Sequence, residues 1–192
     1  YCRTCAEDAS VLLRGCSRLN QIADQQYFCQ TESLFGSKKG GAVMTKCESY
    51  DLTAWGKPFE KAVREIPDLP DKAVLVKVTA AGLCHSDLHI KKGFMDLGER
   101  GKLTFTQRGA QLPLTLGHEI AGTVEATGAS VTDVAPGQSV VVFPWIGCRT
   151  CLACDEDRES DCSAMRIIGI HRNGGFATHV VVEDEKFLID ID

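Results

Sequence analysis

The sequence of 192 residues has no apolar run that approaches the roughly 20 residues required by a membrane-spanning helix. It has no basic segment followed by an apolar segment at its beginning, so no secretory signal is predicted. It has no excess of positive charge, and the formal net charge of −5 argues against a nucleic-acid partner, which requires a basic face. No internal repeat and no G-x-G-x-x-G dinucleotide fingerprint occurs. The composition, 44% apolar and 24% charged, is ordinary for a soluble globular protein.

Cysteine is abundant by contrast, and four of the ten cysteines form one closely spaced group. Cys148, Cys151, Cys154 and Cys162 have the spacing C-x2-C-x2-C-x7-C. Tetrahedral zinc takes four thiolates at about 2.3 Å, and a tight loop with a cysteine at every third position can wrap three sulfurs around one ion. Cys162 would complete the shell and leave no open position, so we predict a structural zinc in a lobe at residues 148–162.

Two other uses of these four cysteines remain open from the spacing. Two disulfides are the first, although cysteines three residues apart in a tight loop are poorly oriented to pair and nothing indicates secretion. An iron–sulfur cluster is the second, because C-x2-C-x2-C opens the bacterial ferredoxin motif; that motif continues with x3-C-P, whereas Ser163 follows Cys162 here. If most of the ten cysteines hold metal, they suit a reducing compartment, and we expect a cytoplasmic protein.

The first 43 residues differ from the remainder. They begin with Tyr1 rather than Met and contain four cysteines with only one C-x2-C pair, so a poorly ordered leader is favoured over a second zinc site. We expect a chain cut from something longer or a misread start. A polar, glycine-rich break at residues 37–41 precedes Met44, where we place the beginning of a domain that runs over residues 44–192.

Short strands dominate the predicted secondary structure of that domain. Apolar alternation or a continuous apolar run predicts strands at residues 73–79, 120–127, 139–143, 177–183 and 186–191. The run at 139–143 predicts a strand that is buried on both faces. Many short strands separated by Gly and Pro indicate a small barrel or sandwich.

Between the first two of these strands, the sequence predicts a short helix capped by Ser86 or Asp87, and then a long polar loop at residues 91–112. Cys84 and His118 flank this stretch. A thiolate and an imidazole are half of a Cys2His or Cys-His-carboxylate zinc site. Residue type alone favours a buried cysteine and a hydrogen-bonded histidine instead.

Several segments together resemble the signatures of zinc-dependent medium-chain alcohol dehydrogenases. They are VLVKVTAAGLCHSD at residues 74–87, GHEIAG at residues 117–122, the four-cysteine lobe, and weaker matches at residues 56–58 and 65–70. The similarity extends from about residue 46 to residue 192, with three motifs in the family's order. It implies a mainly β fold, a GroES-like partial β-barrel with short helices and a zinc-binding lobe.

The resemblance implies a role for each matching residue around a catalytic zinc. Cys84 and His118 would be zinc ligands, Glu119 would lie beside the metal and ligate it transiently, and Asp87 would orient His118. In the family, zinc acts as a Lewis acid that favours loss of the alcohol proton before hydride transfer to NAD or NADP.

The resemblance also implies a proton relay and contacts with the two small molecules. Ser86 and His89 would pass the alcohol proton to solvent, and His85 would contact the cofactor pyrophosphate. Trp145 occupies the place of a substrate-pocket residue, although an ordinary core aromatic is an equal alternative. The implied partner is a small alcohol or aldehyde, and the implied full-length protein is a homo-oligomer.

The departures from the family pattern qualify these expectations. The family's third zinc ligand and its Rossmann cofactor domain come after the position of Asp192, Gln138 replaces the family's usual Asp, and residues 187–191 lack its usual proline. We therefore expect the N-terminal catalytic part of an alcohol dehydrogenase, inactive until it is joined to a cofactor domain. The alternative is a zinc-binding GroES-like module without enzymatic activity.

Overall fold

The computed structural model describes residues 45–66 and 68–191, so the leader predicted at residues 1–43 lies outside the described residues. The described strands are β1 (Lys46–Leu52), β2 (Glu60–Glu65), β3 (Val74–Gly82), β4 (Phe94–Asp96), β5 (Lys102–Thr104), β6 (Leu114–Thr115), β7 (Glu119–Thr127), β8 (Ser139–Val142), β9 (Trp145–Ile146), β10 (Arg166–Ile167), β11 (His179–Val182) and β12 (Leu188–Asp190). The α-helices are α1 (His85–Lys92) and α2 (Leu152–Asp155), and short 3-10 turns occur at Gly98–Arg100, Glu159–Asp161 and Glu185–Phe187. The mainly β fold class is confirmed.

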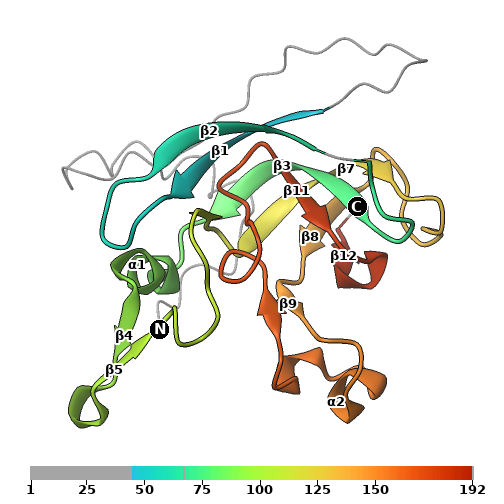
Figure 1. Cartoon of the computed structure of the whole chain (residues 1–192). Helices are drawn as coiled ribbons and strands as arrows, with labels where there is room; N and C mark the ends of the chain where they lie inside the picture. Colours follow the sequence, from blue (N-terminus) through green and yellow to red (C-terminus); the bar gives the residue numbers. More distant parts are fainter. Residues whose placement is uncertain (1–44, 67, 192) are drawn as a thin grey trace. The chain divides into compact units, whose positions relative to one another are not determined.

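Two antiparallel sheets form the body of the domain (Figure 1). The larger sheet has five strands in the order β11-β3-β7-β8-β12, and the smaller has three in the order β2-β1-β6. The long central strands β3 and β7 pair from Val74 opposite Thr127 to Gly82 opposite Glu119. Because these strands end side by side, the residues that follow β3 and precede β7 are brought together.

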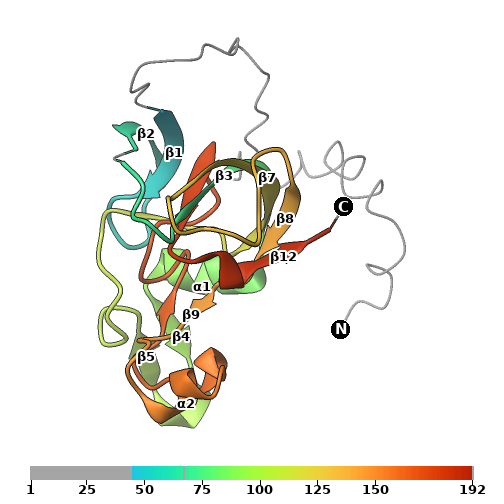
Figure 2. The same ribbon diagram turned by 90° about the vertical axis from the view of Figure 1, so that its right-hand side faces the viewer.

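The five-stranded sheet is curved. Register shifts in the β3–β7 pair lie between Leu75 and Val76 and between Val78 and Ala80. Such bulges bend a strand and increase its twist. Figure 2 shows the resulting curvature of β3, β7 and β8.

The chain just before β11 joins the two sheets. Tyr50 of β1 donates its backbone N–H to the Phe176 carbonyl at 2.9 Å, and the Thr178 N–H donates to the Glu48 carbonyl at 2.8 Å. On the other side, the Val78 N–H donates to the Thr178 carbonyl at 2.9 Å. Backbone hydrogen bonds therefore connect β1 to β3 through this segment, which gives the partly closed barrel that the resemblance implied.

Two apolar clusters stabilise the domain. The first lies on the large sheet and is built mainly of β-branched residues, which suit a pleated and buried surface: Val74, Val76, Val78, Ile120, Val124, Val140, Val142, Ile146, Ile168, Val180, Val182 and Phe187. The second packs under α1 and beside β6: Ile90, Phe105, Ala110, Leu114, Leu116, Ile167 and Ile170.

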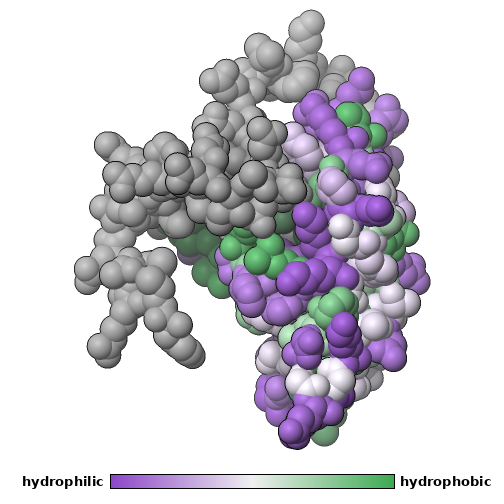
Figure 3. All heavy atoms as spheres, turned by 90° about the vertical axis from the view of Figure 1, so that its left-hand side faces the viewer, coloured by the Kyte–Doolittle hydropathy of each residue, from purple (hydrophilic) through white to green (hydrophobic). Residues whose placement is uncertain are grey.

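The predicted loop at residues 91–112 is wrong in its first half. Helix α1 continues to Lys92, ends at Gly93 in the left-handed conformation (φ 88°), and is followed by a β4–β5 hairpin. Period-2 alternation was hard to detect because each strand has only three residues. The side of the molecule that carries α1 and this hairpin is largely hydrophilic in its described part (Figure 3).

Two smaller predictions also need correction. The N-cap of α1 is Cys84, whereas Asp87 occupies the third helical position and accepts a hydrogen bond from the Cys84 backbone N–H at 2.9 Å. Strand β8 is fully buried only at Val140 and Val142, while Ser139 and Val141 are half-buried. No described helix is long and apolar enough to cross a membrane.

Candidate metal centres

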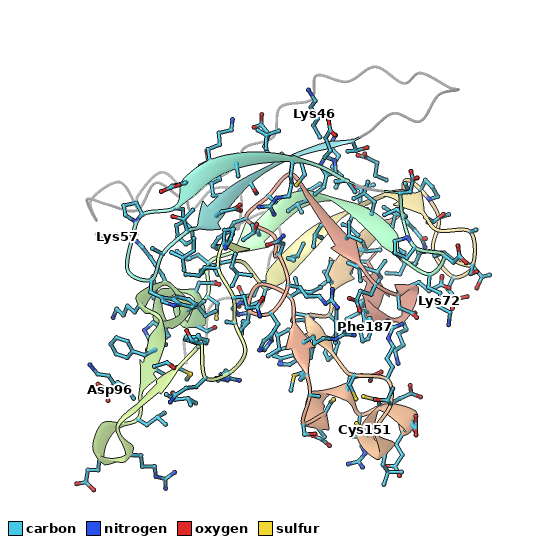
Figure 4. The ribbon with its side chains drawn as sticks, viewed as in Figure 1. Lys46, Lys57, Lys72, Asp96, Cys151 and Phe187 are labelled. Carbon is cyan, nitrogen blue, oxygen red and sulfur yellow. The ribbon has the colours of Figure 1, made fainter. Side chains whose placement is uncertain are left out.

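Four cysteine sulfurs converge in the lobe at residues 148–162. The Sγ atoms of Cys148, Cys151, Cys154 and Cys162 all lie within 4.8 Å of one another. Individual separations are 3.5 Å from Cys151 to Cys154, 3.8 Å from Cys151 to Cys162 and 4.0 Å from Cys148 to Cys154. Figure 4 shows the sulfur atoms gathered around the labelled Cys151.

These separations fit one metal ion better than two disulfides or a four-iron cluster. Two sulfurs at 2.3 Å from an ion, at the tetrahedral angle, are about 3.8 Å apart, whereas disulfide sulfurs are about 2.05 Å apart. All six cysteines in the described part of the chain are free thiols. In a four-iron, four-sulfur cluster each cysteine binds a different iron, which places the sulfurs farther apart than they are here. The donor set therefore suits a single thiophilic ion such as zinc.

The ionisation of these thiols also favours a bound cation. Hydrogen bonds from the Thr150 side chain and backbone lower the pKa of Cys148 to about 6. The Cys154 backbone N–H lowers the pKa of Cys151, but the adjacent Cys154 and Cys148 sulfurs outweigh it and raise that pKa to about 11. One thiolate therefore forms readily and the next is opposed by its neighbours, so a full set of thiolates requires a positive ion.

Close packing on the inner side of the lobe holds the cysteines together. A Cβ on Gly147 would lie 2.4 Å from Cys154 Sγ and 2.7 Å from Glu159 Cγ, so only glycine fits there. The buried Glu159 carboxylate forms an ion pair with Lys186, and this contact lowers the pKa of Glu159. The lobe is thus linked to the turn that precedes β12.

A second group of metal-binding side chains lies where β3 and β7 end. Ligand atoms of Cys84, His118 and Glu119 lie within 4.8 Å of one another. Cys84 caps α1, and His118 and Glu119 are at the beginning of β7, so the β3–β7 register brings together residues 34 positions apart. A thiolate, an imidazole and a carboxylate are all ligands that zinc accepts.

Asp87 connects the two halves of this group. Its buried carboxylate accepts backbone hydrogen bonds from Cys84 at 2.9 Å and from Gly117 at 3.3 Å. Its Oδ1 atom lies 3.4 Å from the buried Nδ1 of His118, which has no other acceptor among the described residues. Asp87, through hydrogen bonding and charge, and to a smaller extent Cys84, outweigh burial and raise the pKa of His118 to about 9. With Nδ1 toward Asp87, Nε2 is left for Cys84 and Ser86.

Glycines permit the close approach of the backbone segments around His118. Gly117 has φ 91°, and a Cβ on it would lie 2.7 Å from the Phe176 ring. A Cβ on Gly174 would lie 2.1 Å from the Gly117 carbonyl oxygen. Across the β3–β7 pair, a Cβ on Gly82 would lie 2.2 Å from Glu119 Oε2. The Glu119 carboxylate therefore lies over Gly82, close to the Cys84 sulfur.

The other predicted site residues lie at varying distances from this group. The Ser86 hydroxyl is 3.0 Å from Cys84 Sγ and 3.2 Å from His118 Nε2. His89 lies one turn along α1 from His85, with the two ring centroids 4.6 Å apart. Trp145 is 39% exposed in β9 and packs on Phe143 with ring centroids 5.3 Å apart, so it is not an ordinary core aromatic.

One buried polar cluster was missed by the sequence reasoning. Ser49, Asp51 and Thr115 are 1%, 4% and 0% exposed. Asp51 forms an ion pair with Arg64 of β2. A signal did exist: the inward positions of β1 alternate as Cys47, Ser49 and Asp51, and a carboxylate at such a position requires a buried partner.

Comparison with known proteins adds a family assignment to this geometry. A protein-family profile described as the alcohol dehydrogenase GroES-like domain matches residues 70–192. An NAD-dependent alcohol dehydrogenase of Sulfurisphaera tokodaii is 39% identical over 138 residues, which is 71% of this chain and 38% of that enzyme. Galactitol 1-phosphate 5-dehydrogenase of Escherichia coli is 35% identical over 119 residues, covering 62% of this chain and 31% of that enzyme.

Solved structures show the same architecture. A zinc-binding dehydrogenase from Sinorhizobium meliloti 1021, bound to NADP, superposes with a TM-score of 0.63 at 33% identity, over 77% of this chain and 39% of that one. D-arabinose dehydrogenase from Sulfolobus solfataricus gives 0.64 at 29% identity, over 78% and 41%. The chain thus spans about two fifths of the length of these relatives.

Proposed function

We propose that this chain, which belongs to the zinc-dependent medium-chain alcohol dehydrogenase family and carries its GroES-like domain, supplies the zinc-binding catalytic part of an enzyme that oxidises a small alcohol with NAD or NADP. The observation that carries the proposal is the convergence of Cys84, His118 and Glu119 at the ends of β3 and β7. The structure of a zinc-binding dehydrogenase bound to NADP supports zinc and a nicotinamide coenzyme as the cofactors of the family. The cofactor domain, the third zinc ligand and the choice of coenzyme belong to the whole enzyme.

Two zinc ions would have different tasks. Four thiolates from Cys148, Cys151, Cys154 and Cys162 would hold a structural ion with a closed shell. Cys84 and His118 would hold the catalytic ion with open positions, and Glu119 would ligate it transiently. When bound there, zinc supplies Lewis-acid stabilisation of the charge that develops on the alcohol oxygen.

The residues of this chain would orient the site and remove the proton. Asp87 would fix the His118 tautomer by facing Nδ1, which leaves Nε2 free for the metal. The Ser86 hydroxyl, beside Cys84 and His118, would accept the alcohol proton and pass it to His89, because an imidazole can both accept and donate a proton. His85, the first residue of α1, would contact the coenzyme pyrophosphate. Trp145, exposed beside Phe143, would line the substrate pocket.

The location and assembly of the whole enzyme are further proposals. The six described cysteines are free thiols, which supports the reducing cytoplasm. The homo-oligomer implied by family resemblance is tested by light scattering on the full-length protein.

The test is a chimera. Residues 46–192 replace the matching part of the Sulfurisphaera tokodaii enzyme, whose remaining residues supply the cofactor domain. We expect alcohol-dependent formation of reduced nicotinamide by the chimera and none by residues 1–192 alone, because hydride transfer needs the nicotinamide within about 3.5 Å of the carbinol carbon. Cys84→Ala and His118→Ala should abolish turnover, whereas Cys47→Ala should retain it. A folded chimera that binds zinc but does not oxidise any alcohol or polyol would instead support a non-enzymatic zinc module.

A further inference from the structure

We propose that Asp51, on the smaller sheet, is a positioning residue for the candidate catalytic metal centre, acting through Thr115 on His118. The inference rests on the proposed function in one respect, that Cys84 and His118 hold a metal ion. It assigns a role to a buried carboxylate that lies outside the group of metal-binding side chains.

The Asp51 carboxylate is held by several side chains. Asp51 Oδ1 accepts hydrogen bonds from the Ser49 hydroxyl at 2.9 Å and from the Thr115 hydroxyl at 2.6 Å. Its Oδ2 atom pairs with the Arg64 guanidinium, which also donates to Thr115 Oγ1 at 3.1 Å. Asp51 is 4% exposed and Thr115 is fully buried, so little water competes for these contacts.

Further contacts connect Thr115 to the metal group. Thr115 is three residues before His118, and its N–H donates to Asn173 Oδ1 at 3.1 Å. Its carbonyl accepts from the Gly174 N–H at 2.8 Å. All the polar groups of Thr115 therefore have hydrogen-bond partners, and these bonds fix the position of Thr115 relative to β1 and β2.

At the other end of the segment formed by residues 115–118, the contacts are made by Asp87. Gly117 donates to Asp87 at 3.3 Å, and Asp87 faces His118 Nδ1. Residues 115–118 are thus held between two buried carboxylates, Asp51 on one side and Asp87 on the other. If Asp51 or the Thr115 hydroxyl is removed, the side-chain contact of this segment with β1 and β2 is lost while its backbone hydrogen bonds remain, and we expect the imidazole to shift relative to Cys84.

The experiment uses the full chain with zinc retained in the four-cysteine site. The test variants are Asp51→Asn, which removes the charge that pairs with Arg64, and Thr115→Val, which removes only the hydroxyl. Two readouts are followed: the dissociation constant of the second zinc equivalent, by competition with a chelating dye, and the imidazole NMR resonances of His118, assigned with His118→Gln. We expect both variants to weaken the second zinc about tenfold, as for other partners outside the ligand shell, and to shift the His118 resonances.

Three matched controls separate positioning from general destabilisation. Thr115→Ser retains the hydroxyl and should restore wild-type behaviour. Glu48→Gln removes the exposed ion pair with Lys61, 2.8 Å, from the same β1–β2 pair and should change neither readout. Val182→Ala lowers stability in the distant β11 and should leave His118 unaffected at temperatures well below unfolding.

The outcomes distinguish this inference from the proposed function. If wild-type chain binds no second zinc, the proposed catalytic centre fails, while the His118 resonances still test whether Asp51 positions that ring. Folded Asp51→Asn and Thr115→Val chains with unchanged His118 resonances would overturn the inference whether or not the second zinc binds. A shift of these resonances in Thr115→Val, reversed in Thr115→Ser, would support it.

Discussion

The Nδ1 atom of His118 lies 3.4 Å from Oδ1 of Asp87; the Asp87 side chain is buried and the His118 side chain is 12% exposed. The same carboxylate accepts the backbone N–H of Cys84 at 2.9 Å. The Asp87 side chain on α1 thus helps to fix the positions of two candidate metal ligands: Cys84, which follows β3, and His118, which precedes β7. The metal-free site should consequently be organised before any ion binds.

A first prediction concerns the proton on His118 when the Cys84–His118 site holds no metal. Its pKa is raised from 6.5 to about 9, chiefly by Asp87. The folded state binds this proton more tightly than the unfolded state, so the stabilisation is complete below about pH 6.5 and is lost as pH rises toward 9. At about 1.4 kcal/mol per pKa unit, the contribution is at most about 3.5 kcal/mol.

The measurement is an NMR titration of the His118 ring after a mild chelator has emptied this site. Asp87→Asn should return the pKa toward 6.5. Glu125→Gln, which removes a carboxylate 3.2 Å from His179 instead, should not change it. A wild-type His118 that titrates near 6.5 contradicts the prediction.

A second prediction concerns the four-cysteine lobe. Cys151→Ala should remove one zinc equivalent per chain and lower the melting temperature, because the binding energy of such a site is folding energy. Cys47→Ala is the matched control, since Cys47 is a buried free thiol outside the lobe. It should cost about 1 kcal/mol and retain all the zinc. Elemental analysis of reduced protein checks both, and iron in place of zinc would refute the assignment.

A third prediction tests the packing against the lobe. Gly147→Ala places a methyl group 2.4 Å from Cys154 Sγ, so the sulfur must move away from the other three. We expect weaker zinc retention and a loss of about 1–3 kcal/mol in the free energy of unfolding. Ser163→Ala, a similarly small change at an exposed position beside the lobe, should alter neither. Chelator challenge and thermal melting measure the two effects.

A fourth prediction compares two glycines of the β3–β7 pair. At Gly122 a Cβ would lie 2.3 Å from the Lys77 carbonyl oxygen, which is backbone and cannot move away. Gly122→Ala should therefore cost several kcal/mol, at or above the usual overpacking range of about 1–3 kcal/mol. At Gly82 the three nearest atoms to an added Cβ all belong to the Glu119 side chain, with Oε2 at 2.2 Å and Cβ at 3.0 Å, and none is backbone. Gly82→Ala should cost about 1 kcal/mol or less, yet displace the Glu119 carboxylate.

Urea denaturation compares the free energies of unfolding of Gly122→Ala and Gly82→Ala, and zinc titration reports the displacement of the Glu119 carboxylate. Equal losses of stability would mean that Glu119 is held rigidly over Gly82. In that case the transient ligation proposed for Glu119 would be wrong.

Local patterns were sufficient for much of this protein. The spacing of Cys148, Cys151 and Cys154 predicts a loop that wraps its sulfurs around one point, and the structure has that loop. Alternating valines correctly predicted β3 from its first residue to Thr79, although the strand continues to Gly82, and the strand at residues 120–127 was confirmed with β7 beginning one residue earlier. These features depend on neighbours within a few residues, which is the range over which side-chain periodicity is informative.

The tertiary structure alone decided which distant residues meet. The β3–β7 register places Gly82 beneath Glu119 and brings Cys84 to His118, and from residue types alone that pair was weak evidence for a site. The burial of Asp51 with Thr115 depends on the pairing of β1 with β6, across 64 positions of sequence. Such contacts arise from strand order and close backbone approach, which long-range packing selects and local periodicity does not encode.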